Sequence, residues 1–111
     1  MIDAQVFAEL QASAGEEFVA ELIDTFADEV PGMLAALRSA FAAGDADAFR
    51  RAAHSLKSNS NTFGASGLAE RARELERGGL PASAAPIDAL AREMDHGLAA
   101  LKALARGAAG G

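Results

Sequence analysis

Apolar residues recur at spacings of three and four along almost the whole chain, and this period is typical of amphipathic α-helices. Sustained alternation of apolar and polar residues is missing and β-branched residues are few, so no strand is predicted. Interruptions of the period divide the chain into five helical segments. The first segment spans about 3–12, and the second runs from "SAGE" (13–16) to "AAGDAD" (42–47). The third spans 45 to about 63, the fourth about 66–77 and the fifth about 84–105. In the four segments other than the third, the following apolar residues are predicted to face the core: in the first, Ile2, Val6 and Leu10; in the second, Phe18, Leu22, Phe26, Val30, Met33, Leu37 and Phe41; in the fourth, Leu68, Ala72 and Leu75; and in the fifth, Ile87, Leu90, Met94, Leu98, Leu101 and Ala105.

Capping residues mark the ends of these segments. Asp3 and Asp45 can accept hydrogen bonds from the first free amides of the helices that follow them. Ser13, with Glu16 three residues later, fits a capping box, which predicts that the second helix starts there. Gly44 can adopt the left-handed conformation that ends a helix.

Pro31 lies inside the second segment. Proline lacks an amide hydrogen and its ring clashes with the carbonyl one turn back, so we expect a kink or a local break near Glu29 and Val30. Pro86, in contrast, falls in the first turn of the last segment, where proline is tolerated.

Short connections between long amphipathic helices favour antiparallel neighbours. The last four segments therefore predict an all-α fold, an antiparallel up-down four-helix bundle, with the short N-terminal helix capping one end. The chain of 111 residues has the size of one domain, which we expect to span residues 1–107. Residues 108–111 are expected to form a flexible C-terminal tail.

The composition narrows the function classes. The chain has no Cys, which excludes disulfides and thiolate metal sites. Its net charge of −6 argues against nucleic acid or an anionic membrane as a partner. No apolar run approaches the roughly 18 residues of a membrane span, and the N-terminus lacks the regions of a signal peptide. The sequence therefore predicts a soluble cytoplasmic protein.

Negative charge is concentrated at the start of the chain. The eight charged side chains among the first 37 residues are all acidic, whereas Arg50, Arg51 and Lys57 reverse the balance further on. Two interpretations are open: a solvated acidic face, and a dipolar surface that orients a protein partner.

The stretch "AHSLKSNSNTFG" (53–64) places polar residues in an alanine-rich helix. An α-helix turns by about 100° per residue, which separates the third segment into two faces. The face predicted to meet the core consists of Phe49, Ala53, Leu56, Ser60 and Phe63. A second group, roughly 80° to 140° away, consists of Arg50, His54, Lys57 and Asn61. His54 is therefore expected to project from the side of the bundle.

Such surroundings suit an imidazole that accepts a phosphoryl group. A neutral imidazole is a nucleophile, and once it carries a phosphoryl group, Lys57 and Arg50 become stabilising partners of the anion. The small Ser58 leaves room for a bulky partner. The residues alone leave a second interpretation open, in which His54 is an ordinary surface residue and the polar run only loosens the helix before its end at Gly64.

The chain resembles the histidine-containing phosphotransfer (HPt) domains of bacterial and plant phosphorelays. The residues that carry the resemblance are Ala53, His54, Leu56, Lys57, Gly64, Ala65 and Leu68, followed by "ARELE" (72–76). It extends over nearly the whole chain, including the proline before "MLAALRSAFAAGD" (33–45). The resemblance implies a monomeric bundle whose His54 carries a phosphoryl group between aspartates of response-regulator receiver domains, with Lys57 neutralising charge on the phosphate. It also implies a hybrid histidine kinase as a partner.

One departure from the family is Ser58, where many members have a glycine that gives the receiver close access to the imidazole. Serine is still small, so docking is expected to survive, with altered partner preference. The residues expected to contact the partner are Arg50, Arg51, Ser58, Asn61 and Gly64.

The chain has no glycine-rich nucleotide loop, so no autokinase activity is expected. No cofactor or metal site of its own is predicted, and magnesium is expected on the partner receiver domain. Two alternatives stay open: a phosphoacceptor domain of a larger chemotaxis-type histidine kinase, and a non-catalytic helical adaptor that binds receiver domains. The initial Met and the glycine-rich end favour an intact small protein.

Overall fold

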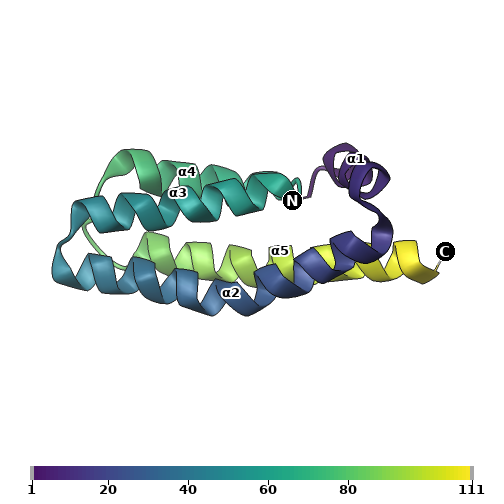
Figure 1. Cartoon of the computed structure of the whole chain (residues 1–111). Helices are drawn as coiled ribbons and strands as arrows, with labels where there is room; N and C mark the ends of the chain where they lie inside the picture. Colours follow the sequence, from purple (N-terminus) through teal and green to yellow (C-terminus); the bar gives the residue numbers. More distant parts are fainter. Residues whose placement is uncertain (1, 111) are drawn as a thin grey trace.

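The computed structural model describes the backbone of residues 2–110 and the side chains of residues 2–107. Within this part the chain forms five helices and no strand, so the predicted all-α class is confirmed (Figure 1). The helices are α1 (Ala4–Ala14), α2 (Glu16–Ala43), α3 (Ala46–Thr62), α4 (Ser66–Gly78) and α5 (Ala85–Gly110). None of the described helices combines the length and the apolar character needed to cross a membrane. The flexible tail predicted for residues 108–111 stays a prediction, because Gly111 and the side chains of 108–110 lie outside the described part.

Three of the predicted caps are present. Asp3 accepts hydrogen bonds from the amides of Gln5 and Val6 at the start of α1. Asp45 accepts from the amide of Ala48 at the start of α3. Gly44 ends α2 with a φ of 68°, in the left-handed region that glycine adopts without steric cost.

The predicted capping box at the start of α2 is wrong. Ser13 belongs to the last turn of α1, where its hydroxyl donates to the carbonyl of Leu10. The two helices are separated by Gly15 alone, whose φ of 96° turns the chain, and no side chain caps α2. Because glycine reaches this conformation at low cost, the break needs neither Ser13 nor Glu16.

Pro31 does not break α2, which is continuous from Glu16 to Ala43. The ribbon of α2 changes direction near its middle (Figure 1), as a proline inside a helix causes.

The face of α2 that meets the core differs from the predicted one in its first half. The buried residues are Val19, Ile23, Phe26, Val30, Leu37 and Ala40. Phe18 is 52% exposed, and Leu22, Met33 and Phe41 are only partly buried. Two adjacent apolar rows run along this helix with the same period, so spacing alone does not tell which row faces inward. On α1 the buried residue is Phe7, while Val6 is exposed.

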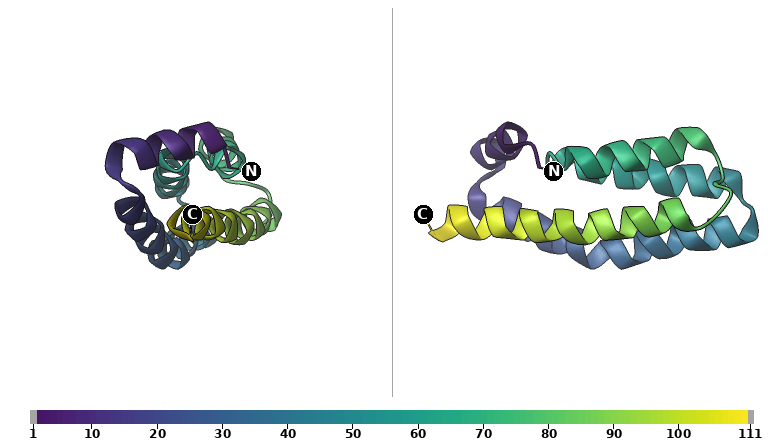
Figure 2. Two further views of the ribbon diagram at one scale, coloured as in Figure 1. Left: turned by 90° about the vertical axis from the view of Figure 1, so that its right-hand side faces the viewer. Right: turned by 180° about the vertical axis from the view of Figure 1, so that it is seen from behind.

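Helices α2 to α5 lie side by side, and each packs against two others of the group: α2 against α3 and α5, and α4 against α3 and α5. The end-on view of Figure 2 shows α2 and α3 along one side and α4 and α5 along the other, with α1 lying across one end. Phe26 of α2 stacks on Phe63 after α3, with ring centroids 5.3 Å apart.

Gly64 joins α1 to the turn between α3 and α4. Its carbonyl accepts a hydrogen bond from the amide of Asp3 at 2.6 Å. Its φ is 73°, and a Cβ there would lie 3.0 Å from both the carbonyl oxygen of Asp3 and the Cβ of Val6. Only glycine allows this approach of the two backbones without strain.

Candidate functional site

Helix α3 presents the two faces that its phase predicts. The inward face is buried throughout, and it consists of Phe49, Ala53, Leu56, Ser60 and Phe63. The one buried polar side chain on it, Ser60, donates its hydroxyl to the carbonyl of Leu56 at 2.8 Å. His54 lies outside this face with 59% of its side chain exposed. Packing of α3 on the core therefore fixes the direction in which His54 points.

His54 and Lys57 share one carboxylate on the neighbouring helix. Nδ1 of His54 contacts Oε2 of Glu76 on α4, and Nζ of Lys57 donates to Oε1 of the same group at 2.6 Å. The side chains of Glu76 and Lys57 are only 15% and 24% exposed. The carboxylate thus holds the imidazole and the ammonium together across the α3–α4 contact.

The charge state of Glu76 determines which nitrogen of His54 carries the proton. The hydrogen bond from Lys57 holds the pKa of the Glu76 carboxyl below its ordinary value, against the opposing effect of partial burial, and His54 adds to the lowering. An ionised carboxylate only accepts hydrogen bonds, so Nδ1 carries the hydrogen. In the neutral imidazole the lone pair is then on Nε2, across the ring from Glu76. This nitrogen has the chemistry of an exposed nucleophile.

Arg50 and Arg51, predicted to lie near His54, form ion pairs with Asp47 in the first turn of α3. Nη2 of Arg50 lies 2.6 Å from Oδ1 of Asp47, and Nε of Arg51 lies 3.4 Å from Oδ2 of the same carboxylate. These contacts, led by the hydrogen bond from Arg50, lower the pKa of Asp47. All three side chains are exposed, so both arginines contribute positive charge to the surface, and their ion pairs are with Asp47.

The other predicted contact residues fall into two groups. Ser58 and Asn61 are exposed on α3, and the carbonyl of Ser58 is occupied by the hydroxyl of Thr62. Gly64 is buried beneath the start of α1. Its position serves the backbone contact with Asp3, and it lies outside the exposed surface around His54.

Glu76 was not among the predicted site residues, although it ends the quoted run "ARELE". The whole charged run around it suggests a solvated helix face. The signal that identifies Glu76 is its distance along the chain, since His54 and Glu76 lie eleven residues before and after Ala65 in the turn. In an antiparallel helical hairpin, residues equally far from the turn lie at the same height.

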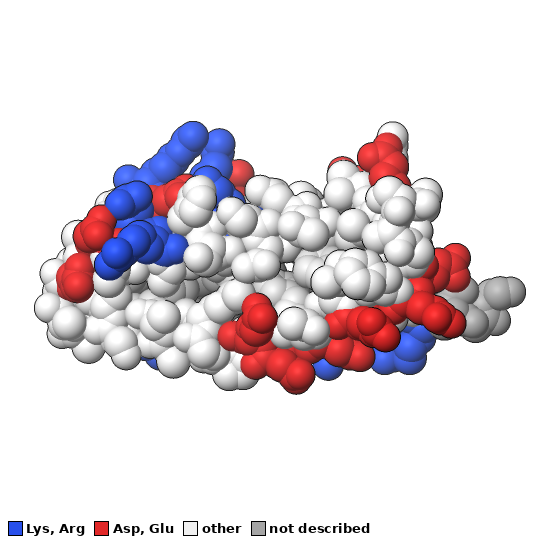
Figure 3. Space-filling model, viewed as in Figure 1, with Lys and Arg blue, Asp and Glu red and all other residues white. Residues whose placement is uncertain are grey.

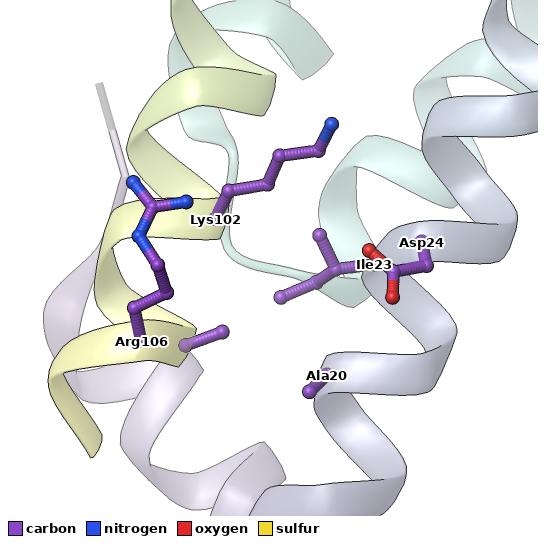
Figure 4. A pocket seen from close by; sticks show the side chains of 6 residues that line it. Ala20, Ile23, Asp24, Lys102 and Arg106 are labelled. Carbon is purple, nitrogen blue, oxygen red and sulfur yellow. The ribbon is translucent and has the colours of Figure 1, made fainter. Parts of the chain in front are cut away.

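Two of the hollows that border α2 lie on different sides of this helix. The α2–α3 groove has a volume of about 500 Å³ and includes Glu29 and Met33 of α2 and Ser55 of α3, the residue after His54. A separate pocket of about 280 Å³ lies between α2 and α5, where Lys102 and Arg106 extend from successive turns of α5 opposite α2 (Figure 4). Among the described residues, no three His, Asp or Glu side chains gather in a way that could hold a metal ion.

A model of the Hpt domain family matches residues 21–105, so this chain belongs to the Hpt domain family. The chain is also similar to a protein of known structure, histidine-containing phosphotransfer protein B (HptB) from Pseudomonas aeruginosa PAO1. The two are 34% identical, and the match covers 96% of this chain and 91% of that chain with a TM-score of 0.74. A search of curated proteins found no match.

The family defines the general function. The chain is a histidine phosphotransfer protein of the two-component phosphorelay type, and proteins of this family work with histidine kinases and response regulators. The predicted family and general function are therefore confirmed.

Proposed function

We propose that Nε2 of His54 accepts a phosphoryl group from the aspartate of one receiver domain and passes it to the aspartate of another. The observation that carries this proposal is the contact of Nδ1 with Glu76, because it leaves the lone pair on Nε2 of a side chain that is mostly exposed. Lys57 supports the same arrangement by keeping Glu76 ionised.

The proposed step balances within the two partners. The bond from Nε2 to phosphorus forms while the bond from phosphorus to the aspartyl oxygen breaks, and the aspartate leaves as a carboxylate. The phosphorylated imidazole is then positively charged, and its Nδ1–H stays hydrogen-bonded to the Glu76 carboxylate, which offsets that charge. Transfer to the next receiver reverses both bond changes, and the neutral imidazole is the leaving group.

Lys57 has two roles in this proposal. Before transfer its ammonium holds the Glu76 carboxylate in place. After transfer the ammonium lies one helical turn from the phosphoryl group and neutralises part of its negative charge. Arg50 and Arg51 add positive charge to the exposed docking surface, which also includes Ser58 and Asn61.

We propose that α2 to α5 form an antiparallel up-down four-helix bundle with α1 as a cap at one end. The packing of each of these four helices against two others supports it. The proposed partners are response-regulator receiver domains and a hybrid histidine kinase, with magnesium bound by the receiver and no autokinase activity in this chain. We further propose that the protein acts as a monomer in the cytoplasm.

The experiment that tests the proposal is phosphoryl transfer from purified receiver domains phosphorylated on aspartate. We expect the chain to acquire a phosphate that is labile in acid and stable in alkali, as a phosphoramidate bond is. The variant His54→Ala should show background labelling only.

The matched control is His96→Ala, which removes the other histidine, an exposed residue of α5. It should be labelled like the original chain. Labelling that survives His54→Ala would overturn the proposal, and tight receiver binding without any transfer would support the adaptor alternative.

A further inference from the structure

The α2–α3 groove lies directly beside His54. Viewed around α3, Glu76 contacts His54 from the α4 side, whereas the groove begins at Ser55 on the α2 side. His54 and Ser58 occupy the exposed ridge between these two sides. A protein that reaches the imidazole from the α2 side must pass over Ser55 and can enter the groove, so the occupant that fits this position is the protein that exchanges the phosphoryl group.

The shape of the groove suits a helix of such a partner. Its lining includes the apolar side chains of Met33, Ala36 and Ala52. Gly32 also lines it, and a Cβ there would meet no side chain and no other helix within 4 Å, its two chain neighbours aside. The hollow continues past Glu29 and Asn59 into a second one of about 240 Å³. The result is an open, elongated apolar track of the kind that accepts one face of an amphipathic helix.

The α2 edge of this track is acidic. We define the acidic lip as Asp28 and Glu29, which both line the groove and are exposed. In the described part of the chain neither has an ion-pair partner, whereas Arg38, Arg50 and Arg51 are each paired elsewhere. Figure 3 views this side and shows negative charge over α2 and positive charge over α3 and α4.

The acidic lip does not stabilise its own helix. The residue one turn before Asp28 is Asp24, and the residues one turn after the lip are Gly32 and Met33, so no cation compensates the charge along α2. Like charges one turn apart are unfavourable. A cation supplied by a docked partner would relieve this repulsion.

We propose that the α2–α3 groove seats a receiver helix that places an apolar side chain against Met33 and pairs Lys or Arg with Asp28 and Glu29. The acidic lip thereby selects among receiver domains. This inference rests on the proposed function, because it assumes that receivers exchange a phosphoryl group with His54.

The test is the double variant Asp28→Lys/Glu29→Lys, assayed with the receiver that labels the original chain fastest. Charges at the rim of an interface act mainly on the association rate and on its salt dependence. We expect kcat/KM for transfer to fall by about 10- to 100-fold at ~50 mM salt and the difference to shrink at ~0.5 M salt. The order of preference among several receivers should also change.

The matched control is Glu74→Lys/Asp95→Lys, which makes the same change in net charge on α4 and α5. Both residues are exposed and have no ion pair in the described part of the molecule. This variant should transfer within about twofold of the original chain. Labelling by the small donor phosphoramidate, which needs no docking, should be equal in all three proteins and shows that His54 is intact.

The possible outcomes separate the two proposals. If the original chain is labelled and the acidic-lip variant has the same rate and salt dependence, the inference is overturned and the proposed function stands. Equal losses in the acidic-lip variant and the control also overturn it. If no receiver labels the original chain, the proposed function fails and the inference fails with it.

Discussion

The two ring nitrogens of His54 have different surroundings, and this difference comes from a single residue. Glu76 accepts from Nδ1 and from Lys57, so one carboxylate sets the tautomer of the imidazole and also engages the ammonium group of Lys57. A residue that orients a histidine through its second nitrogen acts as a positioning residue. Its substitution should therefore change the rate of transfer more than the binding of the partner.

We expect Glu76→Gln to lower the rate of phosphoryl transfer by about 10- to 100-fold, the range found when a hydrogen-bond partner that orients a histidine is lost. The amide is neutral, so it no longer offsets the positive charge of the phosphorylated imidazole, and it can donate to Nδ1 and favour the wrong tautomer. Rapid-quench measurement of the transfer rate, with receiver affinity measured separately, checks this. A weakened affinity with an unchanged rate would contradict the positioning role.

Stability should also depend on pH through Glu76. Lys57 lowers the pKa of this carboxyl in the folded chain, so its contribution is present above the ordinary value of 4.5 and is lost as the pH falls through the lower folded value. Asp47 behaves in the same way below its ordinary 3.8, because of Arg50. We expect the free energy of unfolding to decrease from about pH 5 to about pH 3.

Urea unfolding of the original chain and of Glu76→Gln across this range measures the effect. The difference between the two proteins should be largest near neutral pH and should shrink in acid. A difference that is constant with pH would show that the carboxylate charge contributes nothing.

The sequence sufficed to predict the outward direction of His54 but not its partner. Direction follows from helical phase, which depends only on neighbours along the chain, and the apolar residues of α3 leave one possible phase. The contact with Glu76 depends on how α4 is aligned with α3, and the sequence pattern within one helix does not determine that alignment. The same limit explains α2, where Phe18 and Val19 are both apolar and only packing selects Val19.

At the scale of elements, glycines with positive φ lie at or just after several helix ends, and two of them show what the sequence could not predict. Gly15 separates α1 from α2 where a capping box was predicted, and Gly64 ends the turn after α3 while touching α1. Sequence rules identified Gly64 as a stop because glycine commonly ends helices. They did not reveal its contact with Asp3 and Val6, because that contact joins segments about 60 residues apart.

We expect Gly64→Ala to destabilise the fold by about 1–3 kcal/mol, since it forces a non-glycine residue to positive φ and crowds Asp3 and Val6. The control Gly32→Ala lies within α2 with open space around it and should stabilise by about 0.4–1 kcal/mol. Chemical denaturation of both variants measures the difference. Equal effects of the two substitutions would refute the close approach at Gly64.

At the scale of the whole molecule, α2 and α5 extend beyond the α3–α4 hairpin (Figure 1). Gly97 of α5 still lies near Leu68 at the start of α4, and Leu101 is the last fully buried side chain of α5 in the described part. Beyond it Leu104 is exposed. The all-α class was predictable because each helix carries its own period, whereas this unequal extension depends on how the helices are aligned.

Hydrogen exchange should reflect that extension. We expect the amides of residues 102–107 to exchange faster than those of residues 87–94 of the same helix, because fewer buried side chains hold them. Exchange followed by mass spectrometry on peptides from α5 tests this within one molecule. Equal protection along α5 would mean that its far end is held as firmly as its middle.

The location of Glu76 on α4 also affects how copies of this protein can diverge in evolution. His54, Lys57 and Glu76 all belong to the α3–α4 hairpin, while one wall of the α2–α3 groove comes from a different stretch of the chain. After a gene duplication, substitutions in α2 can accumulate without disturbing the hairpin. The two copies can then diverge into separate signalling routes while both keep the same acceptor chemistry.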